Sequence, residues 1–501
     1  MKTLQQILLA GSIAFMPFCL NAQDNQRWSL EKEGHIRWQP EKIESHQDHI
    51  EMSGKTVSVV LRYGVENGKF ILNKSMVWPL LRTIPNNTHA SLMRRYNWDV
   101  LDMVNINGRS LTSEQVESIE LKGILKVTSN YDEGRRGKWK IIREYFPSTD
   151  QPALVESYQI INTGKNELAI ELPQVNQKSI TDPKKGVTGS FCIETLTDKS
   201  GHFTLQPGES LTFGASLLAY KEGEKAPLID VQKEKGQREA LVGELMNKLV
   251  LETPDPIIDR MFAFSKIRGC ESIYETKGGP MHGPGGESYY AAIWANDQAE
   301  YINPFFPFVG YEYGNASALN SYLHFARFMN DEWKPIPSSI IAEGIDIWNG
   351  AGDRGDAAMI AYGAARYALA RGNKQEAETL WPLIEWCLEY CRRQLNEEGV
   401  VASDSDELEG RFPSGDANLC TSSLYYDALL STSYLCKELG KSGASTYLKQ
   451  AAILRKNMER YFGAQVEGFD TYAYYKGNDI LRSWICIPLT VGIDERAEGT
   501  I

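Results

Sequence analysis

A run of acidic residues, Asp404-Ser405-Asp406-Glu407-Leu408-Glu409, is the first place in this chain where residue types and spacing suggest chemistry. Carboxyl groups crowded this closely raise one another's pKa, and a carboxyl that stays protonated near neutral pH can donate a proton to a leaving group. Glu407 and Glu409 are the candidates for this proton donor. The same composition also fits a solvated acidic loop or a loop that binds calcium weakly.

A second segment, GGESYYAAIWANDQAEY over Gly285–Tyr301, places flat aromatic rings beside carboxylates. This mixture is typical of a sugar-binding surface, since an indole can offer its apolar face to the C–H face of a sugar ring. Trp294 is the candidate for that ring, although packing in the core is the commoner role of a tryptophan that stands alone. Weaker candidates in the same segment are Tyr289, Tyr290 and Glu300.

A third segment, WNGAGDRGD over Trp348–Asp356, places a guanidinium group among acids. The planar fork of Arg354 suits recognition of hydroxyl groups. Asp353 and Arg354 are favoured here because Asp356 is explained as the N-cap of the helix that follows. Two tryptophans, Trp348 and Trp484, are candidates for the lining of the same site.

All three segments lie in or at the end of long connections between helices, which cover 274–311, 332–354 and 396–417. Connections of around twenty residues or more are uncommon in a compact helical domain and are usually functional. If the helices pair into hairpins around an axis, these connections converge at one end of that axis.

The sequence around these connections has a helical period. The expected helices cover Asp356–Arg371, a stretch after Asn373, Asn418–Leu439 and Ala444–Phe462. Asp356 is the expected N-cap of the first helix and Gly372 lies just beyond its end, while Asn373 and Glu376 form a capping-box pattern for the second. Helices joined by two or three residues are antiparallel αα-hairpins.

The first half of the chain has the pattern of β structure from about Trp28 to Gln232. The clearest strands are TVSVVLRYGV (56–65), KWKIIREYF (138–146), ALVESYQIIN (153–162) and LAIELPQV (168–175). They are rich in β-branched and aromatic residues and are separated by turn sequences such as Asn107-Gly108. Many short strands with such turns predict an antiparallel β-sandwich.

The formal net charge is -12 and no basic stripe occurs, which argues against nucleic acid or an anionic membrane as a partner. The N-terminus has the pattern of a secretory signal peptide, with Lys2 before an apolar stretch and a cleavage site after Ala22. A lipoprotein anchored at Cys19 is the alternative, although Phe18 is bulky for the position before such a cysteine. No later segment is apolar enough to span a membrane, so a periplasmic or secreted protein is expected.

The 8 cysteines become an odd number once Cys19 leaves with the signal peptide. Cys387 and Cys391 lie one helical turn apart on an apolar stripe, so we expect buried thiols rather than a disulfide. No Cys/His spacing resembles a zinc site, and no metal or other cofactor is expected. His282 and His324 are expected to be structural or to lie at the rim of the site.

An exported β-sandwich followed by αα-hairpins resembles the six-hairpin (α/α)6 glycoside hydrolases, which include trehalase-, glucoamylase-, glucosidase- and rhamnosidase-like enzymes. Three segments carry the resemblance, which covers roughly 255–501. PGGESYYAAIWAND (284–297) is similar to the trehalase-type Pro-Gly-Gly segment and to the Trp-x-Arg-Asp segment of glucoamylases. IPSSIIAEGIDIWNGAGDRGD (336–356) stands where the loop after the second helix is found. DELEGRFPSGDANLCTSSLYYDAL (406–429) is similar to the loop that carries the acid.

The resemblance implies roles for individual residues. Glu407 stands four residues before Arg411-Phe412, which is the offset of the acid before Arg-Trp in trehalase-like loops, so Glu407 is the favoured acid and Glu409 the alternative. Asp297 matches the residue that accepts hydrogen bonds from the hydroxyls of the terminal sugar. Arg411 joins the residues expected to bind sugar.

The resemblance also implies an organisation. We expect a signal peptide over 1–22, a β-sandwich over 23–235, a linker over 236–254 and an incomplete (α/α)6 toroid over 255–501. A complete toroid has twelve helices and the sequence suggests about seven, so the chain resembles a C-terminally truncated member of the group. The general base is then expected beyond residue 501, and the isolated fragment is expected to be unstable or inactive. An inverting reaction is likewise inherited from the resemblance.

The leading hypothesis is an exo-acting glycoside hydrolase that removes terminal sugars from oligosaccharides or polysaccharides by general acid/base catalysis. A polysaccharide lyase with an α/α toroid is the first alternative, and it would need a Tyr/His pair and basic residues that face uronates. A non-catalytic carbohydrate-binding protein is the second alternative, which needs the aromatic rings and Asp297 but no acid.

Overall fold

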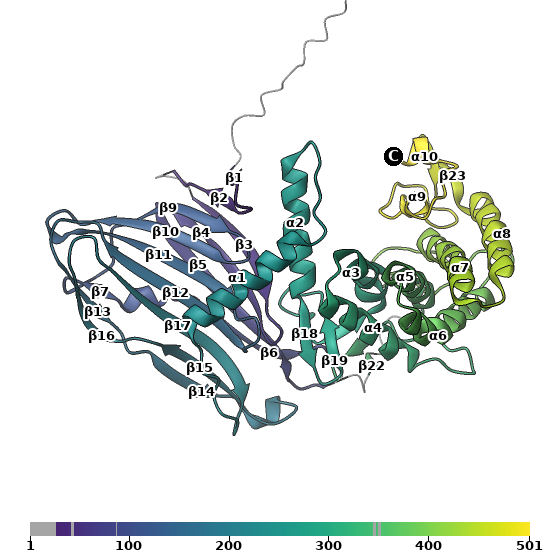
Figure 1. Ribbon diagram of the computed structural model, residues 1–501. Coiled ribbons are helices and arrows are strands. Elements are labelled where there is room, and N and C mark those ends of the chain that lie inside the picture. The colour runs from purple at the N-terminus through teal and green to yellow at the C-terminus, as the bar shows by residue number, and fades with distance from the viewer. Residues whose placement is uncertain (1–26, 42–44, 87, 344–346, 349–351) are drawn as a thin grey trace, which may run out of the picture.

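The computed structural model describes residues 27–41, 45–86, 88–343, 347–348 and 352–501. The expected signal peptide lies outside these residues. Antiparallel β-sheets occupy the chain up to residue 221, and the chain from residue 231 onward is mainly helical (Figure 1). The predicted order of a β part followed by an α part is therefore confirmed.

Three antiparallel sheets form the β part. The nine-stranded sheet has the order β1 (Trp28–Leu30), β2 (Ile36–Trp38), β9 (Glu114–Leu121), β10 (Leu125–Asp132), β11 (Lys138–Pro147), β12 (Ala153–Asn162), β17 (Ser210–Lys221), β15 (Phe191–Thr197), β14 (Asn176–Ile180). A four-stranded sheet follows the chain through β3 (His46–Ser53), β4 (Ser58–Glu66), β5 (Lys69–Arg82) and β6 (Ser91–Tyr96). The other has the order β16 (Gly201–Leu205), β13 (Leu168–Leu172), β7 (Asn105–Ile106), β8 (Arg109–Ser110).

All three sheets contribute to one hydrophobic core, with Leu61 of β4, Ile141 of β11 and Ile170 of β13 among its members. In strand β13 the buried residues alternate with exposed ones along LAIEL, which is the period-two pattern of a strand with one face in the core. The four strands expected from composition correspond to β4, β11, β12 and β13.

The expected linker at 236–254 is wrong in one respect, because helix α1 runs through Val231–Asn247 and crosses the expected boundary at 235. Asp230 caps this helix by accepting hydrogen bonds from two backbone amides. Val231 packs on the outer face of the nine-stranded sheet. Arg238 is fully buried and pairs with Glu271 at 2.5 Å, so α1 joins the sheets to the first helix of the α part.

The α part contains the following elements. Its helices are α2 (Pro256–Glu271), the π-helix η4 (Ala295–Ile302), α3 (Asn303–Val309), α4 (Glu312–Ala326), α5 (Asp356–Arg371), α6 (Lys374–Arg393), α7 (Leu419–Leu439), α8 (Ala444–Phe462), α9 (Ile487–Thr490) and α10 (Ala497–Thr500). Its short strands are β18 (Ile273–Thr276), β19 (Gly279–His282), β20 (Ala292–Trp294), β21 (Ser339–Ile341), β22 (Ile347–Trp348), β23 (Gly463–Val466) and β24 (Phe469–Tyr472).

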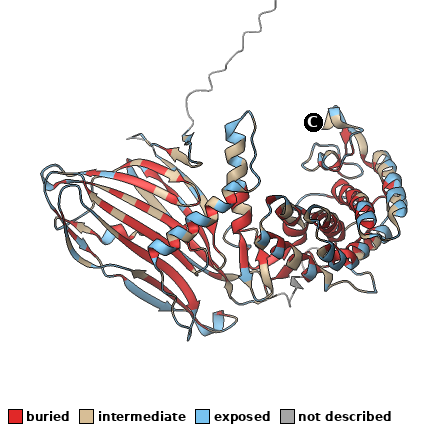
Figure 2. Ribbon diagram, viewed as in Figure 1, coloured by how far each residue is buried: buried red, intermediate tan, exposed pale blue. Residues whose placement is uncertain are grey.

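The helices form two layers that differ in burial. Helices α5 and α7 are buried along most of their lengths, whereas α6 and α8 bury one face and expose the other (Figure 2). A helix that is apolar all round lies inside a domain and an amphipathic one lies at its surface. The alternation of inner and outer helices therefore follows from the composition of each helix.

Helix ends agree with most of the cap predictions. Gly372 is left-handed with φ 63° directly after α5, and Asn373 caps α6 by accepting hydrogen bonds from two backbone amides. Asp356 is not the N-cap of α5, because Gly355 holds that position with φ 83° and Asp356 is the first helical residue. A side chain at Gly355 would collide with Thr421 of α7, which explains the glycine at this point.

Burial accounts for the cysteines as the sequence predicts. Cys387 and Cys391 are buried free thiols on the inner face of α6, and the other described cysteines are free as well. Within the described part of the chain, every helix is too short or too polar to traverse a lipid bilayer.

Candidate active site

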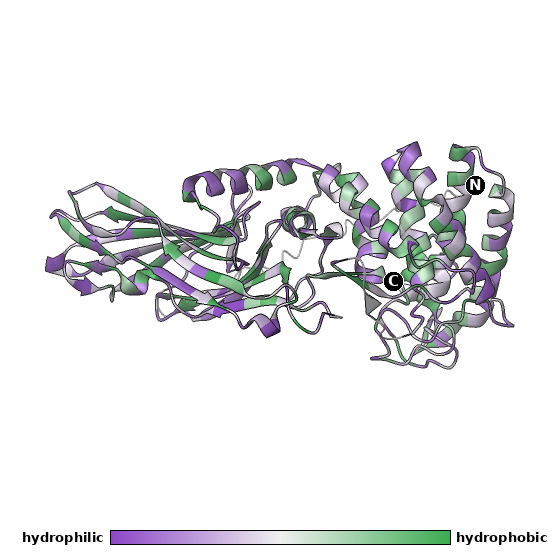
Figure 3. Ribbon diagram, turned by 90° about the horizontal axis from the view of Figure 1, so that it is seen from below, coloured by the Kyte–Doolittle hydropathy of each residue, from purple (hydrophilic) through white to green (hydrophobic). Residues whose placement is uncertain are grey.

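Loops gather at one end of the helices (Figure 3), and backbone hydrogen bonds join the three long connections to one another. The amide of Asp404 donates to the carbonyl of Asp353 at 2.9 Å, which joins the third connection to the second. The amide of Ala295 donates to the carbonyl of Ser338 at 2.9 Å, which joins the first to the second. The convergence predicted from the lengths of the connections is therefore confirmed.

Glu407 lies at the centre of this region and is 7% exposed. The hydroxyl of Tyr301 donates to its two carboxyl oxygens at 3.3 and 3.1 Å, and the indole N–H of Trp484 donates to the Tyr301 oxygen at 3.3 Å. Burial raises the pKa of Glu407 to about 7, against the lowering effect of the Tyr301 hydrogen bond and with a smaller raising effect from Asp406. A carboxyl with this pKa is partly protonated at neutral pH, as a proton donor must be.

Two more carboxyl groups lie beside Glu407 on the π-helix η4. Glu300 is 3% exposed, and burial together with the charge of Glu407 raises its pKa well above the ordinary value. Burial also raises the pKa of Asp297, while the nearby guanidinium of Arg354 lowers it. π-Helical turns often occur at functional sites because the extra residue changes where side chains point. Here η4 brings Asp297, Glu300 and Tyr301 to the region of Glu407.

Glu409 has a different environment from Glu407. The Arg354 guanidinium donates to one carboxylate oxygen at 2.9 Å and Arg411 donates to the other at 3.0 Å. Arg354 is 1% exposed and also pairs with Asp356 at 3.3 Å. Glu409 has a left-handed backbone with φ 57°, which is a strained conformation for this residue type. Both carboxylate oxygens of Glu409 are therefore engaged by arginines, whereas those of Glu407 meet the Tyr301 hydroxyl.

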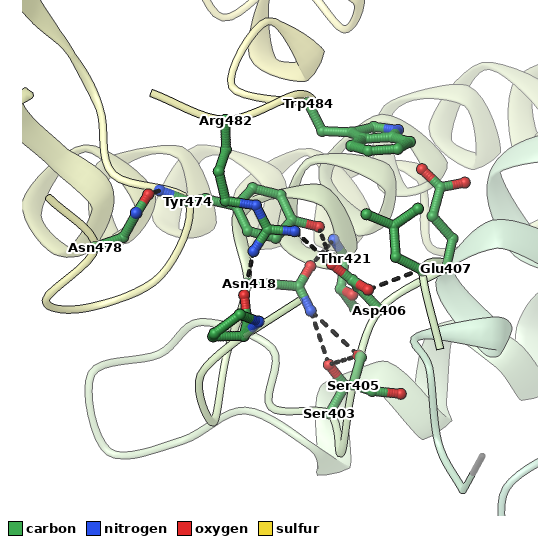
Figure 4. A network of polar contacts seen from close by, with 12 residues as sticks. Ser403, Ser405, Asp406, Glu407, Asn418, Thr421, Tyr474, Asn478, Arg482 and Trp484 are labelled. Carbon is green, nitrogen blue, oxygen red and sulfur yellow. Dashed lines mark hydrogen bonds and ion pairs between the residues drawn. The ribbon is translucent and has the colours of Figure 1, made fainter. Parts of the chain in front are cut away.

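Asp406 anchors the loop that carries both glutamates (Figure 4). One of its oxygens accepts from the Tyr474 hydroxyl at 2.9 Å and lies 3.4 Å from the Arg482 guanidinium, and the other accepts from the amide of Leu408 at 2.9 Å. Asp406 is 1% exposed. The carboxylate of Asp406, the residue before Glu407, is therefore already engaged in hydrogen bonds and an ion pair within the protein.

Asp353 is likewise engaged inside the protein. Its oxygens accept from the Tyr390 hydroxyl at 2.6 Å and from the amide of Gly355 at 2.8 Å. Burial raises the pKa of Asp353 to about 6, partly offset by the Tyr390 hydrogen bond. These contacts fix the turn that leads from Arg354 into α5, a role that the sequence did not suggest for Asp353.

Trp294, the favoured candidate for the sugar-binding ring, is buried, whereas the weaker candidate Tyr289 is exposed. The ring of Trp294 is only 5% exposed because Tyr289 and His89 pack against it at centroid distances of 5.7 Å. Tyr289 is 47% exposed. The expected open face of Trp294 is therefore covered, and the exposed ring at this position belongs to Tyr289.

Other predicted residues are placed as follows. Tyr290 is 1% exposed and packs edge-on against Tyr274 at 5.8 Å, in a small cluster with Val77 of the β part, away from the carboxylates. Trp348 ends strand β22, but its side chain falls outside the described part of the structure. His282 and His324 are buried, as expected for structural residues.

Two residues of this region were missed by sequence reasoning. Tyr301 lies in the aromatic segment, but only the fold shows that its hydroxyl reaches Glu407. His89 comes from the β part, between β5 and β6, so nothing in the local sequence connects it with Trp294. No cluster of the described residues has the composition and geometry of a metal site.

Replacing Tyr301 with phenylalanine should raise the pKa of Glu407, because the hydroxyl that stabilises its ionised form is removed. A carbon-13 NMR titration of the glutamate carboxyls checks this, with Glu407→Gln used to assign the resonance. Tyr434→Phe, which alters an exposed tyrosine of α7, is the matched control and should leave the titration unchanged. An unchanged or lowered midpoint in Tyr301→Phe would show that this hydrogen bond does not control Glu407.

The comparison with known proteins gives distant structural similarity alone. No protein-family model matches the chain, and no curated protein matches it in sequence. One similar solved structure is a human-microbiome protein assigned as a kojibiose phosphorylase, at 9% identity and a TM-score of 0.49, covering 86% of this chain and 69% of that one. A bacterial glucoamylase in complex with acarbose shares 11% identity with a TM-score of 0.47, covering 89% of this chain and 74% of that one.

A third similar structure is a family 105 glycoside hydrolase of C. acetobutylicum ATCC 824, at 12% identity and a TM-score of 0.32, covering 42% of this chain and 58% of that one. At such identities and TM-scores these structures transfer neither a residue's role nor a substrate to this chain.

Proposed function

We propose that this chain is an exported glycoside hydrolase that removes terminal sugars from an oligosaccharide or polysaccharide. In this proposal the N-terminal sheets form a β-sandwich, and the helices belong to an (α/α)6 toroid whose long connections build the active site. Glu407 is the general acid and Glu409 holds the position of Arg354.

The observation that carries the proposal is the environment of Glu407. Its carboxyl is buried, titrates near neutral pH and lies beside Asp297 and Glu300. Such a group can keep a proton at neutral pH and still release it during a reaction. The ring of Tyr301, whose hydroxyl donates to Glu407, is 48% exposed, and Tyr289 of the same segment is 47% exposed. Carboxyl groups and exposed aromatic rings together suit a sugar better than other classes of substrate.

The reaction follows from these groups. Glu407 donates its proton to the glycosidic oxygen as the bond between that oxygen and the anomeric carbon breaks, and the bonding electrons stay with the oxygen. Water then adds to the anomeric carbon and gives up a proton to a carboxylate. If the reaction is inverting, as the resemblance implies, the water approaches from the face opposite to the leaving group.

The remaining residues bind and orient the sugar in this proposal. Asp297 accepts hydrogen bonds from hydroxyl groups of the terminal sugar, and Arg354 keeps Asp297 and Glu409 in place by its charge. Arg411 and Trp484 lie at the edge of the site and contact the rest of the substrate. Glu300 is a buried neighbour whose pKa is raised by burial and by the charge of Glu407, so it favours the protonated form when Glu407 is ionised.

The arrangement of charges disfavours a lyase. A lyase that acts on uronates needs cationic groups free to bind the substrate carboxylate. Arg354 and Arg411 both pair with Glu409, and Arg482 pairs with Asp406. The basic groups described around Glu407 are therefore already neutralised by carboxylates of the protein.

The test is hydrolysis of a panel of aryl glycosides by the full-length protein in phosphate-free buffer, so that water is the only acceptor. Activity should decline as the pH rises through about 7, because the deprotonated form of Glu407 cannot act as an acid. Activity should also decline at low pH, because the carboxylate that accepts the proton from water is then protonated and can no longer act as a base. The bell-shaped dependence of kcat/KM on pH measures both groups.

Each competing function predicts a different product. A lyase would release an unsaturated product that absorbs in the ultraviolet, and a non-catalytic protein would bind glycans without releasing aryl groups. Hydrolysis whose rate keeps rising well above pH 7 would contradict the assignment of Glu407. The anomeric proton spectrum of the first product formed distinguishes inversion from retention.

A further inference from the structure

Three aromatic rings meet at the junction between the β part and the α part, and we call His89, Tyr289 and Trp294 the junction triad. The ring of His89 lies 4.8 Å from that of Tyr289 and 5.7 Å from that of Trp294, and the last two rings are 5.7 Å apart. His89 comes from the connection between β5 and β6, whereas the other two precede η4. Two parts of the chain thus build one aromatic cluster, and its Trp294 directly precedes η4, the helix that carries Asp297 and Glu300.

The triad leaves one ring open to solvent. Trp294 is 5% exposed, His89 is partly buried, and Tyr289 is 47% exposed. Rings packed only to fill a core would all be covered, and an isolated surface tyrosine would have no rings behind it. Tyr289 is thus the exposed ring of the triad, and the rings of His89 and Trp294 pack against it.

The segment that carries Tyr289 is fastened to the four-stranded sheet. Glu287 accepts hydrogen bonds from Arg62 of β4 and Arg95 of β6, both at 2.8 Å, and these contacts lower the pKa of Glu287 to about 2, with Arg62 as the main cause. The backbone of Glu287 is left-handed with φ 67°, and Gly285 and Tyr289 exchange two backbone hydrogen bonds across it. Strained residues of this kind persist when surrounding contacts hold them, and they concentrate at binding sites.

The segment that carries His89 is fastened from both sides as well. The buried Arg82 side chain donates to the carbonyls of Thr88 and Ala90, on either side of His89. The same guanidinium binds both oxygens of Glu343 in the α part at 3.0 and 3.2 Å. Arg82 and Glu343 are 4% and 7% exposed, so this contact is shielded from solvent. The position of His89 relative to Trp294 is therefore fixed by an ion pair between the two parts of the chain.

We propose that the junction triad is a stacking subsite for a sugar ring, with Tyr289 as the platform and the β part contributing to substrate binding through His89. This inference rests on the proposed carbohydrate substrate. The apolar C–H face of a pyranose packs on an aromatic face, and a ring held in advance loses little freedom when the sugar binds. Asp297 lies three residues after Trp294 in the chain, so the triad and the carboxylates of η4 belong to one continuous segment.

The test measures binding separately from turnover, in the full chain carrying Glu407→Gln. Affinity electrophoresis with starch, xylan, mannan and rhamnogalacturonan identifies the bound glycan, and calorimetry with a hexasaccharide of that glycan gives Kd. Adding Tyr289→Ala should weaken binding by about 10-fold or more, because a stacking contact is lost. Tyr289→Phe keeps the ring and should stay within about 2-fold, while His89→Ala should weaken binding less than Tyr289→Ala.

Tyr434→Ala is the matched control, since Tyr434 is 52% exposed on α7 and its loss should not change Kd. Unchanged binding in Tyr289→Ala would overturn the subsite, and hydrolysis by the protein with native Glu407 would then leave the proposed function standing. Tyr289-dependent binding without hydrolysis would support the subsite and refute the hydrolase. Binding to none of the four glycans would overturn the subsite, and the aryl glycoside assay would judge the proposed function on its own.

Discussion

Replacing Glu407 with glutamine in the full-length protein should lower kcat about 100- to 10,000-fold, which is the range that general acid catalysis contributes. Glutamine has nearly the same shape, and its amide oxygen can still accept a hydrogen bond from Tyr301, but it has no acidic proton to give. The loss should be large for an unactivated disaccharide, whose leaving oxygen needs that proton. Steady-state kinetics at pH 6 measure it, where wild-type Glu407 is mostly protonated.

The leaving group provides the control for this prediction. A dinitrophenyl glycoside loses its phenolate without protonation, so Glu407→Gln should keep much of its activity on that substrate. A variant that is merely misfolded would lose both activities alike. Glu409→Gln is the matched variant: it breaks contacts to Arg354 and Arg411 and should lower activity on both substrates by a similar factor. If Glu409→Gln instead shows the dependence on the leaving group, Glu409 is the acid.

Sequence patterns located most of the elements that carry these residues. Helix α5 begins and ends where its period and Gly372 predicted, and α7 (Leu419–Leu439) agrees within one residue with the expected helix over Asn418–Leu439. Caps and periodicity are local properties, so they can be recognised without knowing what a helix packs against. The loop that bears Glu407 could be singled out for a related reason, since its length and its acids are both visible in the sequence.

Contacts between distant segments could not be predicted in this way. The approach of Tyr301 to Glu407 depends on a π-helix, whose extra residue per turn has no clear sequence signal. The burial of Trp294 depends on His89, more than two hundred residues earlier in the chain. Sequence alone suggests which residue types can bind a sugar, but their exposure is decided by tertiary packing.

Helix α1 was missed for a reason that its composition explains. Its inward positions include Glu234 and Arg238, which are buried and paired, rather than an unbroken row of apolar residues. A search for apolar periodicity does not detect a helix that buries charges. A hydrogen bond from the Ser148 hydroxyl to Glu234 and the ion pair between Arg238 and Glu271 bind the helix to the segment after β11 and to α2.

Replacing Gly363 with alanine should destabilise the protein by about 3 kcal/mol and impair the site, although glycine to alanine normally stabilises a helix. Gly363 lies where α5 crosses η4, and a methyl group there would stand 1.5 Å from the carbonyl oxygen of Ala299. That oxygen also accepts a hydrogen bond from Tyr322 at 2.9 Å, so η4 has no free direction in which to move. Glu300 follows Ala299 directly, so any shift of η4 displaces the carboxyl group beside Glu407.

Thermal unfolding and kcat on an aryl glycoside measure the two effects, and both should fall together in Gly363→Ala. Gly236→Ala in α1 is the matched control, because a methyl group there meets nothing within 4 Å. That variant should gain about 0.5–1 kcal/mol, since alanine restricts the unfolded chain and fits the helix. The same chemical change is thus expected to act with opposite sign at two helical glycines. Equal stability of the two variants would mean that α5 and η4 can move apart without loss of folding free energy. The close crossing of their backbones would then not be what positions Glu300 and Tyr301.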